Sequence, residues 1–481
     1  MKQLPEKLLQ SLAGVEGFNR EAFVKVHASQ EQVTSIRINP AKARNGKLET
    51  ALEDSFHLQR SNSTSGFSSS FIHDRIPWSQ YGFYLTERPS FTFDPLFHAG
   101  CYYVQEASSM FLEQAFKQLV DLSKPLKILD LCAAPGGKST HIQSLISSDS
   151  VLVSNEIIRS RNNILIDNII KWGAHNVLVS NNDSSAFQKL EGYFDVMVVD
   201  APCSGSGLFR KDEEAINEWS PNNVQLCSQR QQRILADALP ALKENGILVY
   251  STCSYSREED EAIMDWLVEE LKMENVELKI ENDWGIVEAY SQKTKSKGYR
   301  FYPDKVKGEG LFLSCFRKIS PARESKHRAI KFEKASNKEK AIIQPWLTTN
   351  EFDIIKDNNS FFALSSSQAE EYSVLSSVLN IQYKGTRIGQ VMKDRLVPDH
   401  SLALSGIISN EIPNTELSYE EAIKYLQRQD VHFETWSKGW QLVRYIGYNL
   451  GWVNVLPNRI NNYYPKEMRI LKQRNDSAFE K

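Results

Sequence analysis

Five short apolar runs, separated by helical stretches, constrain the fold of this chain more than any other feature. The runs LKILDL, VLVSNE, NVLVSNND, FDVMVVD and GILVYS fall between residues 126 and 251 and are rich in β-branched residues. Strand alternating with helix is typical of a doubly wound parallel sheet. Because the runs are apolar throughout, both faces of that sheet should be covered by helices. We therefore predict a Rossmann-like α/β sheet at the centre of the chain.

The 481 residues are enough for about three domains at roughly 150 residues each. We expect an N-terminal α/β extension over 1–100, the sheet domain over 101–320, an intermediate module over 321–394 and a separate C-terminal region over 395–481. Helices are expected in LPEKLLQSLAG, NREAFVKVHAS and YVQEASSMFLEQAFKQLV, a strand in TSIRIN, and a low-complexity loop at 61–70. Residues 291–340 hold 15 Lys and Arg against five acids, which favours a linker or a domain edge.

Composition excludes several classes of protein. The net charge of -3 gives no sign of nucleic-acid binding by the chain as a whole, so such binding must depend on local patches. Six cysteines without a CxxC pair favour neither a disulfide framework nor a structural zinc site. The segment MKQLPEKLLQ is unlike a signal peptide, and no apolar stretch approaches the ~20 residues of a membrane span. We expect a cytoplasmic protein with neither a metal nor a membrane partner.

The segment ILDLCAAPGGKST, residues 128–140, reads as a strand, a tight glycine turn and the start of a helix. It matches neither GxGxxG nor the P-loop, and by itself it could be a plain connection. Acids also follow successive strands, namely Asp130, Glu156, Asp183 and Asp200. Each alone could be a helix cap, but together they would line the crevice at the carboxyl ends of the strands. Glu156 is spaced to meet a ribose and Asp183 an adenine edge, so we predict a nucleoside-containing cofactor.

Two cysteines, Cys203 and Cys253, come directly after predicted strands and lie among small, polar residues. Buried, inert cysteine is the commoner situation, and we expect it for Cys132, Cys227 and Cys315, while Cys101 stays undecided. Thiols in such open loops are reachable, and nearby helix N-termini could lower their pKa from about 8.5. Possible electrostatic helpers are Lys138, Arg210 and Lys211.

A reachable thiolate beside a nucleoside cofactor and an acid suits one reaction in particular. Carbon 5 of cytosine is a poor nucleophile, and attack of a thiolate on C6 makes it enamine-like, so that it can accept a methyl group. An acid at the N3 and N4 edge of the base would favour this addition. A second thiol could assist the final expulsion of the first.

The motifs DLCAAPGGKST, NE, DAPCSGSG and STCSYS, in this order, resemble those of the Nol/Nop/Sun RNA cytosine-5 methyltransferases. The segments FHAGCYYVQEASSM and GWVNVLPNRINNYYPKEMRI extend the resemblance toward a branch that acts on bacterial small-subunit (16S) ribosomal RNA. The family implies a class I methyltransferase sheet that uses S-adenosylmethionine.

Residue roles follow from this resemblance and not from spacing. It implies that Cys253 is the nucleophile and that Cys203 promotes release of the methylated RNA. Asp200 would lie where cofactor and cytosine meet, and Lys138 and Asp200 are candidates for contacting the base or helping proton removal. Glu156 would hold the ribose and Asp183 the adenine side. The residues expected to wrap the cofactor are Cys132, Ala133, Ala134, Pro135, Gly136, Gly137 and Lys138.

Residues 438–474 carry seven Lys and Arg and one acid, interleaved with aromatic residues. The resemblance implies a PUA-like RNA-binding fold here, and Arg459, Lys466 and Arg469 are the surface candidates for RNA contact. The rings could stack on unpaired bases or could form the core of a small β domain. The six rings in question are Trp440, Tyr445, Tyr448, Trp452, Tyr463 and Tyr464.

Three other functions stay open at this point. A transfer-RNA cytosine-5 methyltransferase would use the same motifs. A catalytically idle RNA-binding factor for ribosome assembly could share the fold, although the intact pair Cys203 and Cys253 argues against it. A nicotinamide-dependent oxidoreductase is disfavoured because GxGxxG is missing from the sequence.

Overall fold

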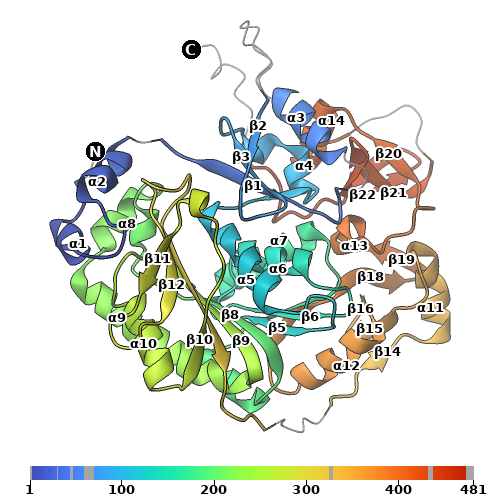
Figure 1. Cartoon of the computed structure of the whole chain (residues 1–481). Coiled ribbons are helices and arrows are strands. Elements are labelled where there is room, and N and C mark those ends of the chain that lie inside the picture. The colour runs from blue at the N-terminus through green and yellow to red at the C-terminus, as the bar shows by residue number, and fades with distance from the viewer. Residues whose placement is uncertain are drawn as a thin grey trace, which may run out of the picture.

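The computed structural model describes residues 3–29, 31–43, 47–58, 70–323, 329–431 and 437–472. Four sheets organise this part of the chain, with ten, five, four and four strands (Figure 1). Of the low-complexity loop expected at 61–70, all but Ser70 lies outside the described residues. Within the described ranges, no helix combines the length and apolar character that crossing a membrane requires.

The ten-stranded sheet contains the five apolar runs as adjacent parallel strands, which confirms the predicted α/β fold. Its order is β11-β12-β13-β9-β8-β5-β6-β7-β17, and β10 pairs with β13. The five parallel strands are β5 (Lys127–Asp130), β6 (Val151–Asn155), β7 (Val177–Ser180), β8 (Phe194–Asp200) and β9 (Leu242–Thr252). The antiparallel strands are β10 (Met273–Val276), β11 (Val287–Tyr290), β12 (Lys297–Phe301), β13 (Leu311–Lys318) and β17 (Ile381–Lys384).

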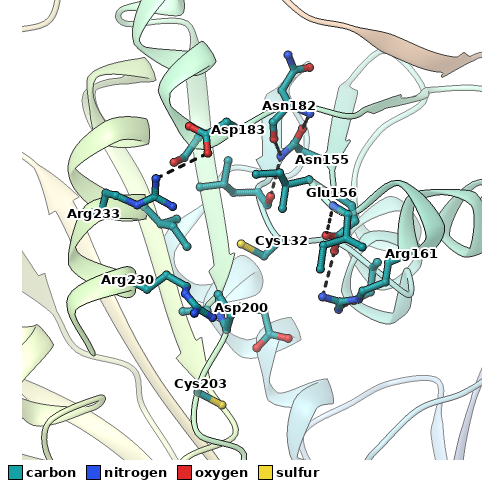
Figure 2. A pocket seen from close by; sticks show the side chains of 18 of the residues that line it. Cys132, Asn155, Glu156, Arg161, Asn182, Asp183, Asp200, Cys203, Arg230 and Arg233 are labelled. Atoms are coloured by element: carbon teal, nitrogen blue, oxygen red, sulfur yellow. Dashed lines mark hydrogen bonds and ion pairs between the residues drawn. The ribbon is translucent and has the colours of Figure 1, made fainter. Parts of the chain in front are cut away.

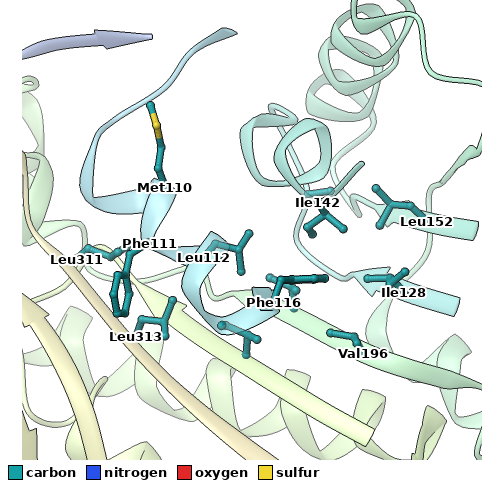
Figure 3. Packing of buried hydrophobic residues seen from close by; sticks show 14 of the residues in the cluster. Met110, Phe111, Leu112, Phe116, Ile128, Ile142, Leu152, Val196, Leu311 and Leu313 are labelled. Carbon is teal, nitrogen blue, oxygen red and sulfur yellow. The ribbon is translucent and has the colours of Figure 1, made fainter. Parts of the chain in front are cut away.

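Helices cover both faces of this sheet, as its apolar strands require. One face packs against α5 (Leu112–Leu119), α6 (Gly137–Leu145) and α7 (Arg159–Trp172). Figure 3 shows Phe116 and Ile142 lying over Ile128, Leu152 and Val196. The other face packs against α9 (Pro221–Ala238) and α10 (Glu261–Glu269). Each fully buried side chain of this kind contributes roughly 1.5–3 kcal/mol relative to exposure.

Three expectations for secondary structure are wrong in part. Residues 103–120 begin as β4 (Tyr102–Val104), because this segment pairs with β1, and only then continue through η3 (Ser108–Phe111) into α5. The basic segment 291–340 is not a linker in its first half, since β12 and β13 pair with the central sheet. The stretch VQLCSQRQQRILADALPALKENG, residues 224–246, has the pattern of one helix, but the helix ends earlier. Helix α9 stops at Ala238, and β9 starts at Leu242 after the 3-10 turn η6 (Leu239–Ala241), which contains Pro240.

The N-terminal segment contains the expected helices α1 (Glu6–Ser11) and α2 (Arg20–Ala28) and the expected strand β1 (Thr34–Ile38). Its sheet has the order β2-β3-β1-β4, with β2 at Ile72–Arg75 and β3 at Gly82–Leu85. Two further helices belong to it, α3 (Leu48–Leu58) and α4 (Pro95–His98).

The five-stranded sheet has the order β14-β15-β16-β18-β19 and follows the central domain in the chain. Its strands are β14 (Glu333–Lys334), β15 (Asp353–Asp357), β16 (Ser360–Leu364), β18 (Thr386–Met392) and β19 (Arg395–Pro398). Three helices accompany it, namely α11 (Asn337–Ile343), α12 (Ser366–Leu375) and α13 (His400–Leu404). Strand β17 leaves this module to pair with β7 of the central sheet. The boundaries at 100, 320 and 394 stay predictions.

The C-terminal sheet packs against the N-terminal one, although the two lie at opposite ends of the sequence (Figure 1). Its strands are β20 (Asn414–Glu416), β21 (Gly439–Tyr445), β22 (Tyr448–Leu456) and β23 (Arg459–Asn462), with α14 at Tyr419–Leu426. Their shared core joins Ile36 and Phe83 of the N-terminal sheet to Tyr425 and Leu450. The two ends of the chain therefore form one packed unit beside the central sheet.

Candidate active site

A cavity of about 600 Å³ opens at the carboxyl edge of the parallel strands. This volume falls within the range of ~300–1,000 Å³ of small-molecule sites. Figure 2 shows acidic and thiol side chains from the strand ends, together with Arg161, Arg230 and Arg233 from helices, pointing into it. Of the predicted site residues, the lining contains Cys132, Ala134, Glu156, Asp183, Asp200, Cys203 and Cys253.

The glycine turn after β5 forms one wall of the cavity. Gly136 adopts φ +111, a left-handed conformation that favours glycine, and α6 starts at the next residue. The turn is held by Arg161, which donates to the carbonyl of Ala134 at 2.8 Å. Cys132 and Ala134 face the cavity, whereas five expected cofactor contacts are not among its lining residues. Those five are Ala133, Pro135, Gly136, Gly137 and Lys138.

Asp130 lies beneath this turn and is fully buried. One carboxylate oxygen accepts a hydrogen bond from Ser139 Oγ at 2.6 Å, while Oδ1 has no partner within the described part of the chain. Burial raises the pKa of Asp130 to about 7, against the opposing effects of Ser139 and Lys138. Asp130 is not among the residues that line the cavity, so the expectation that it lines the crevice is wrong. It supports the turn from behind, through Ser139.

Glu156 and Asp183 follow β6 and β7 and both line the cavity. Glu156 Oε1 accepts from the backbone N–H of Ile158 at 2.9 Å, and its other oxygen lies 3.5 Å from Arg161. Asp183 caps the 3-10 helix η4 (Ser184–Leu190), and the hydroxyl and backbone N–H of Ser185 lower its pKa. Arg233 approaches the Asp183 carboxylate at 3.9 Å. The structure thus places both acids beside apolar residues at one end of the cavity.

Lys138 and Asp200 form an ion pair between the glycine turn and the end of β8. The distance from Lys138 Nζ to Asp200 Oδ2 is 2.7 Å, and Asp200 Oδ1 accepts from Ser251 Oγ at 2.9 Å. Burial acts to lower the pKa of Lys138, yet the negative charge of Asp200 raises it overall, so the ammonium stays charged. A fixed positive charge therefore lies beside the cavity, held by a carboxylate that lines it.

The two predicted thiols, Cys203 and Cys253, meet at the cavity. Their sulfur atoms are 2.9 Å apart, although the residues are separated by 50 positions in the sequence. The pKa of Cys203 is raised well above its usual value, first by the hydrogen bond with Cys253 and then by burial. The expectation that surrounding charge lowers the pKa is therefore wrong for Cys203, which keeps its proton at neutral pH.

The other four cysteines and Arg210, an expected electrostatic partner of the thiols, were predicted with mixed success. Cys227 and Cys315 are buried, as predicted, and so is Cys101. Cys132 is half-buried and lines the cavity, so its expected place in the core is wrong, although burial raises the pKa of its thiol. Arg210 does not approach the thiols; it donates to the carbonyl of Gly308 and pairs with Glu309 at 3.4 Å.

Sequence reasoning missed several polar residues of the cavity. Arg230 and Arg233 project from α9, a helix with no motif, and Arg161 projects from α7. Their spacing indicates a polar helix face, but spacing alone does not say that this face meets a ligand. Asn155 and Asn182 line the wall as well, and the side chain of Asn155 donates to the carbonyls of Leu131 and Asn182.

The C-terminal candidates are three exposed basic residues and six rings that differ in burial. Arg459, Lys466 and Arg469 are exposed, as surface contacts for RNA would require. Of the six rings, Tyr445, Trp452 and Tyr464 are buried in the core, which confirms the structural alternative for these three. Tyr463 is exposed, and Trp440 and Tyr448 are half-buried.

Three family models match the chain. Residues 118–317 match "16S rRNA methyltransferase RsmB/F", residues 4–107 match the "N-terminal domain of 16S rRNA methyltransferase RsmF", and residues 412–470 match "Methyltransferase RsmF PUA domain". The predicted resemblance and the PUA-like C-terminal region are thereby confirmed. The matched segments include the cavity, the N-terminal sheet and the three exposed basic residues.

Curated relatives extend over nearly the same length. Ribosomal RNA small subunit methyltransferase F of Vibrio vulnificus is 28% identical, with 97% of each chain covered. The protein of the same name from Vibrio atlanticus is 31% identical over 82% of this chain and 85% of its own.

Two solved structures share the fold over about two thirds of the chain. A methyltransferase homologue from Pyrococcus horikoshii is 27% identical with a TM-score of 0.51, covering 66% of this chain and all of its own. NSun6 from Pyrococcus horikoshii, solved with SFG, is 19% identical with a TM-score of 0.52, covering 66% of this chain and 98% of its own.

Proposed function

Since the chain belongs to the 16S rRNA methyltransferase RsmB/F family, we propose that it transfers a methyl group from S-adenosylmethionine to carbon 5 of a cytosine in small-subunit ribosomal RNA. The observation that carries this proposal is the pair of thiols 2.9 Å apart, at the same cavity as the ion pair of Lys138 and Asp200. A methyltransferase whose target atom attacked the methyl group directly would need neither thiol.

The residues of the cavity fit the proposed cofactor. Glu156 and Asp183 offer carboxylates for sugar hydroxyls and a base edge. The aliphatic side chains of Ile157, Ile158 and Ile234 line the cavity and suit the flat faces of an adenine ring. When bound, S-adenosylmethionine supplies an electrophilic methyl group on a sulfonium.

The resemblance of its Thr-Cys motif to the family supports Cys253 as the nucleophile. The sulfur atoms of Cys203 and Cys253 lie 2.9 Å apart, and either can be the donor in this contact. The pKa of Cys203 is raised, first by this hydrogen bond and then by burial, so its thiol is suited to hold and deliver a proton.

The proposed reaction begins with the thiol of Cys253 and ends with its release. Cys253 Sγ bonds to C6 of the cytosine, and the electrons of the C5–C6 double bond make C5 nucleophilic. When C5 gains the methyl group, the electron pair of the broken S–CH3 bond would stay with the cofactor sulfur, which would leave as a neutral thioether. C5 then loses its proton, for which the Asp200 carboxylate is the candidate acceptor. The double bond then re-forms, the C6–S bond breaks, and Cys203 can protonate the departing sulfur of Cys253.

The C-terminal module supports RNA as the substrate. A cytosine that is paired in a helix must leave the base stack to reach a thiol at the sheet edge. Arg459, Lys466 and Arg469 are exposed within the segment that matches a PUA domain, and they can contact phosphates beside the flipped base.

The test is transfer of labelled methyl groups from S-adenosylmethionine to unmodified 16S RNA, to small subunits and to transfer RNA, with the product mapped. We expect 5-methylcytosine at a single position of the small-subunit RNA. Label in transfer RNA alone would favour the alternative substrate, and the lack of label in every RNA would favour an idle assembly factor.

The two cysteine variants test the covalent route. Cys253→Ala should abolish transfer without trapping RNA, whereas Cys203→Ala should accumulate a protein–RNA adduct that survives denaturant on a gel. The reverse pattern would show that the roles of the two thiols are exchanged.

A further inference from the structure

A buried carboxylate bonds to both loops that carry the thiols, which are also joined directly by the hydrogen bond from the backbone N–H of Gly207 to the carbonyl of Cys253 at 2.7 Å. Glu259 precedes α10 and is fully buried. Its oxygens accept from the backbone N–H and the hydroxyl of Ser204, at 2.8 and 2.5 Å, and from the hydroxyl of Ser254 at 2.6 Å. Each serine directly follows one of the two thiols in the sequence. Glu259 therefore bonds to the residue next to each of the two cysteines.

Gln231 extends this connection to the residue before Cys203. Its amide nitrogen donates to Glu259 Oε1 at 3.2 Å and to the carbonyl of Pro202 at 3.1 Å. Tyr250 donates to the backbone carbonyl of Glu259 at 2.6 Å. Cys203 is therefore held on both sides by residues that bond to Glu259 or to its partner.

These bonds matter because the loop after β8 has little rigidity of its own. Ser204, Ser206 and two glycines follow Cys203, and Gly205 adopts φ +74. Glycine loses more conformational freedom on folding than other residues, so such a loop needs external contacts to hold one geometry. A charged carboxylate is costly to bury unless donors surround it, and here the donors come from the thiol loops and from Gln231.

We propose that Glu259 is a positioning residue that sets the separation of the two thiols, acting through Ser204 and Ser254. This inference rests on the proposed function for its role in the reaction, but the positioning itself concerns only the protein. Proton exchange between two sulfur atoms requires that they stay within hydrogen-bonding distance. We call the hydrogen bonds of Glu259 to Ser204 and Ser254 the clamp, and it holds that distance in a loop of small residues.

The direct test measures the thiol pair without RNA or cofactor. Diamide removes two electrons and two protons from a pair of thiols, which become a disulfide while diamide becomes the hydrazine. We expect the wild-type protein to form the Cys203–Cys253 bond first among its six cysteines, as detected by alkylation and peptide mass. Glu259→Gln should form it at least ten times more slowly. The matched control is Glu258→Gln, because Glu258 lines a separate cavity, and it should react like the wild type.

Methyl transfer provides the second measurement. Glu259→Gln should lower kcat for transfer about 10- to 100-fold with the KM for S-adenosylmethionine within about twofold, because the clamp contacts the thiol loops and not Glu156 or Asp183, which are proposed to hold the cofactor. Ser254→Ala should lower kcat as well. If Glu259 acts through Ser254, the double variant should lose no more than the more damaged single variant.

Several results would overturn the proposal. They are a wild-type protein that does not cross-link these two cysteines, a Glu259→Gln protein that cross-links at the wild-type rate, and additive effects in the double-mutant cycle. If Glu259→Gln does not fold, Ser204→Ala and Ser254→Ala replace it, and unchanged cross-linking in both would have the same meaning. A failure of RNA methylation with intact cross-linking would count against the proposed function and not against the clamp.

Discussion

The thiol loops and the C-terminal sheet both bury side chains that carry polar groups or aromatic rings, but they bury them for different reasons. In the thiol loops the buried groups are polar, and Glu259 holds Ser204 and Ser254 beside sulfur atoms that stay at the cavity. In the C-terminal sheet the buried groups are rings such as Trp452 and Tyr464, and the charges stay outside.

This difference separates residues that fix a reaction geometry from residues that fix a fold. A buried polar group has few arrangements in which all its hydrogen bonds are satisfied, so it defines the positions of its neighbours narrowly. A buried ring contributes mainly through the apolar area that it removes from water. Substitutions in the two regions should therefore affect different measurements.

The largest effect is expected for a ring of the C-terminal sheet. Trp452→Ala should destabilise the protein by about 3–5 kcal/mol, because the side chain is 1% exposed and packs against Trp346 and Trp440. Denaturant unfolding measures this loss, and diamide cross-linking of the thiols should stay unchanged in the folded protein. The control is Tyr463→Ala, whose ring is 41% exposed and should cost less than about 1 kcal/mol. Equal losses in the two variants would contradict the comparison.

The next effect concerns activity and not stability. Lys138→Met removes the cation that pairs with Asp200 and should slow methyl transfer about 10²- to 10³-fold, the size found when one preorganised charge or donor is removed. Single-turnover transfer and thermal unfolding measure the two quantities separately. Lys124→Met, at an exposed lysine before β5, should change neither. A Lys138→Met protein with the wild-type transfer rate would rule out a part for this ion pair in the reaction.

A smaller effect depends on pH. Because burial raises the pKa of Asp130 to about 7, the folded protein keeps a proton between about pH 4 and 7 that the unfolded chain has released. The stability that this group contributes is therefore greatest below about pH 4 and falls as the pH rises to 7. Asp130→Asn cannot ionise, so its stability relative to wild type should rise by up to about 1.4 kcal/mol per pH unit in this window. Unfolding at pH 5, 6, 7 and 8 measures the difference, which should level off above 7; a constant difference would contradict the assignment.

The smallest effect is expected at the exposed charges of the C-terminal region. Changing Arg459, Lys466 and Arg469 together to Ala should weaken RNA binding roughly tenfold and lower the slope of log affinity against log salt by about 0.7–0.9 for each phosphate that is no longer neutralised. Filter binding over a range of salt concentrations measures both. The control changes three exposed lysines of the central domain, Lys124, Lys189 and Lys272. If the two triple variants bind alike, the C-terminal charges do not contact RNA.

The predictable part of the site follows from local pattern and one rule of topology. Apolar runs of strand length alternate with helical segments, and the carboxyl ends of parallel strands meet at one edge. That rule is enough to place Glu156, Asp183, Asp200, Cys203 and Cys253 around a common cavity. The choice between the two thiols needs the resemblance to a family, because strand order does not distinguish them.

The unpredictable part depends on contacts between segments far apart in the sequence. Arg230 and Arg233 reach the cavity only because α9 packs beside η4, and no motif in that helix indicates it. Glu259 reads as one more acid in the run REED until the loop folds inward. The basic segment 291–340 has the composition of a solvated linker, yet Arg300 is buried with Glu261 and Asp260.

The sequence by itself determined the central α/β sheet, the glycine turn and the set of strand-end acids and thiols, because periodicity and strand termini are properties of neighbouring residues. Only the tertiary structure decided that the two sulfur atoms meet, that one carboxylate joins their loops, and that the N- and C-terminal sheets share a core. Those features depend on which segments, far apart in the sequence, pack against each other and exclude water. Burial then decides which charges must be paired and which pKa values shift.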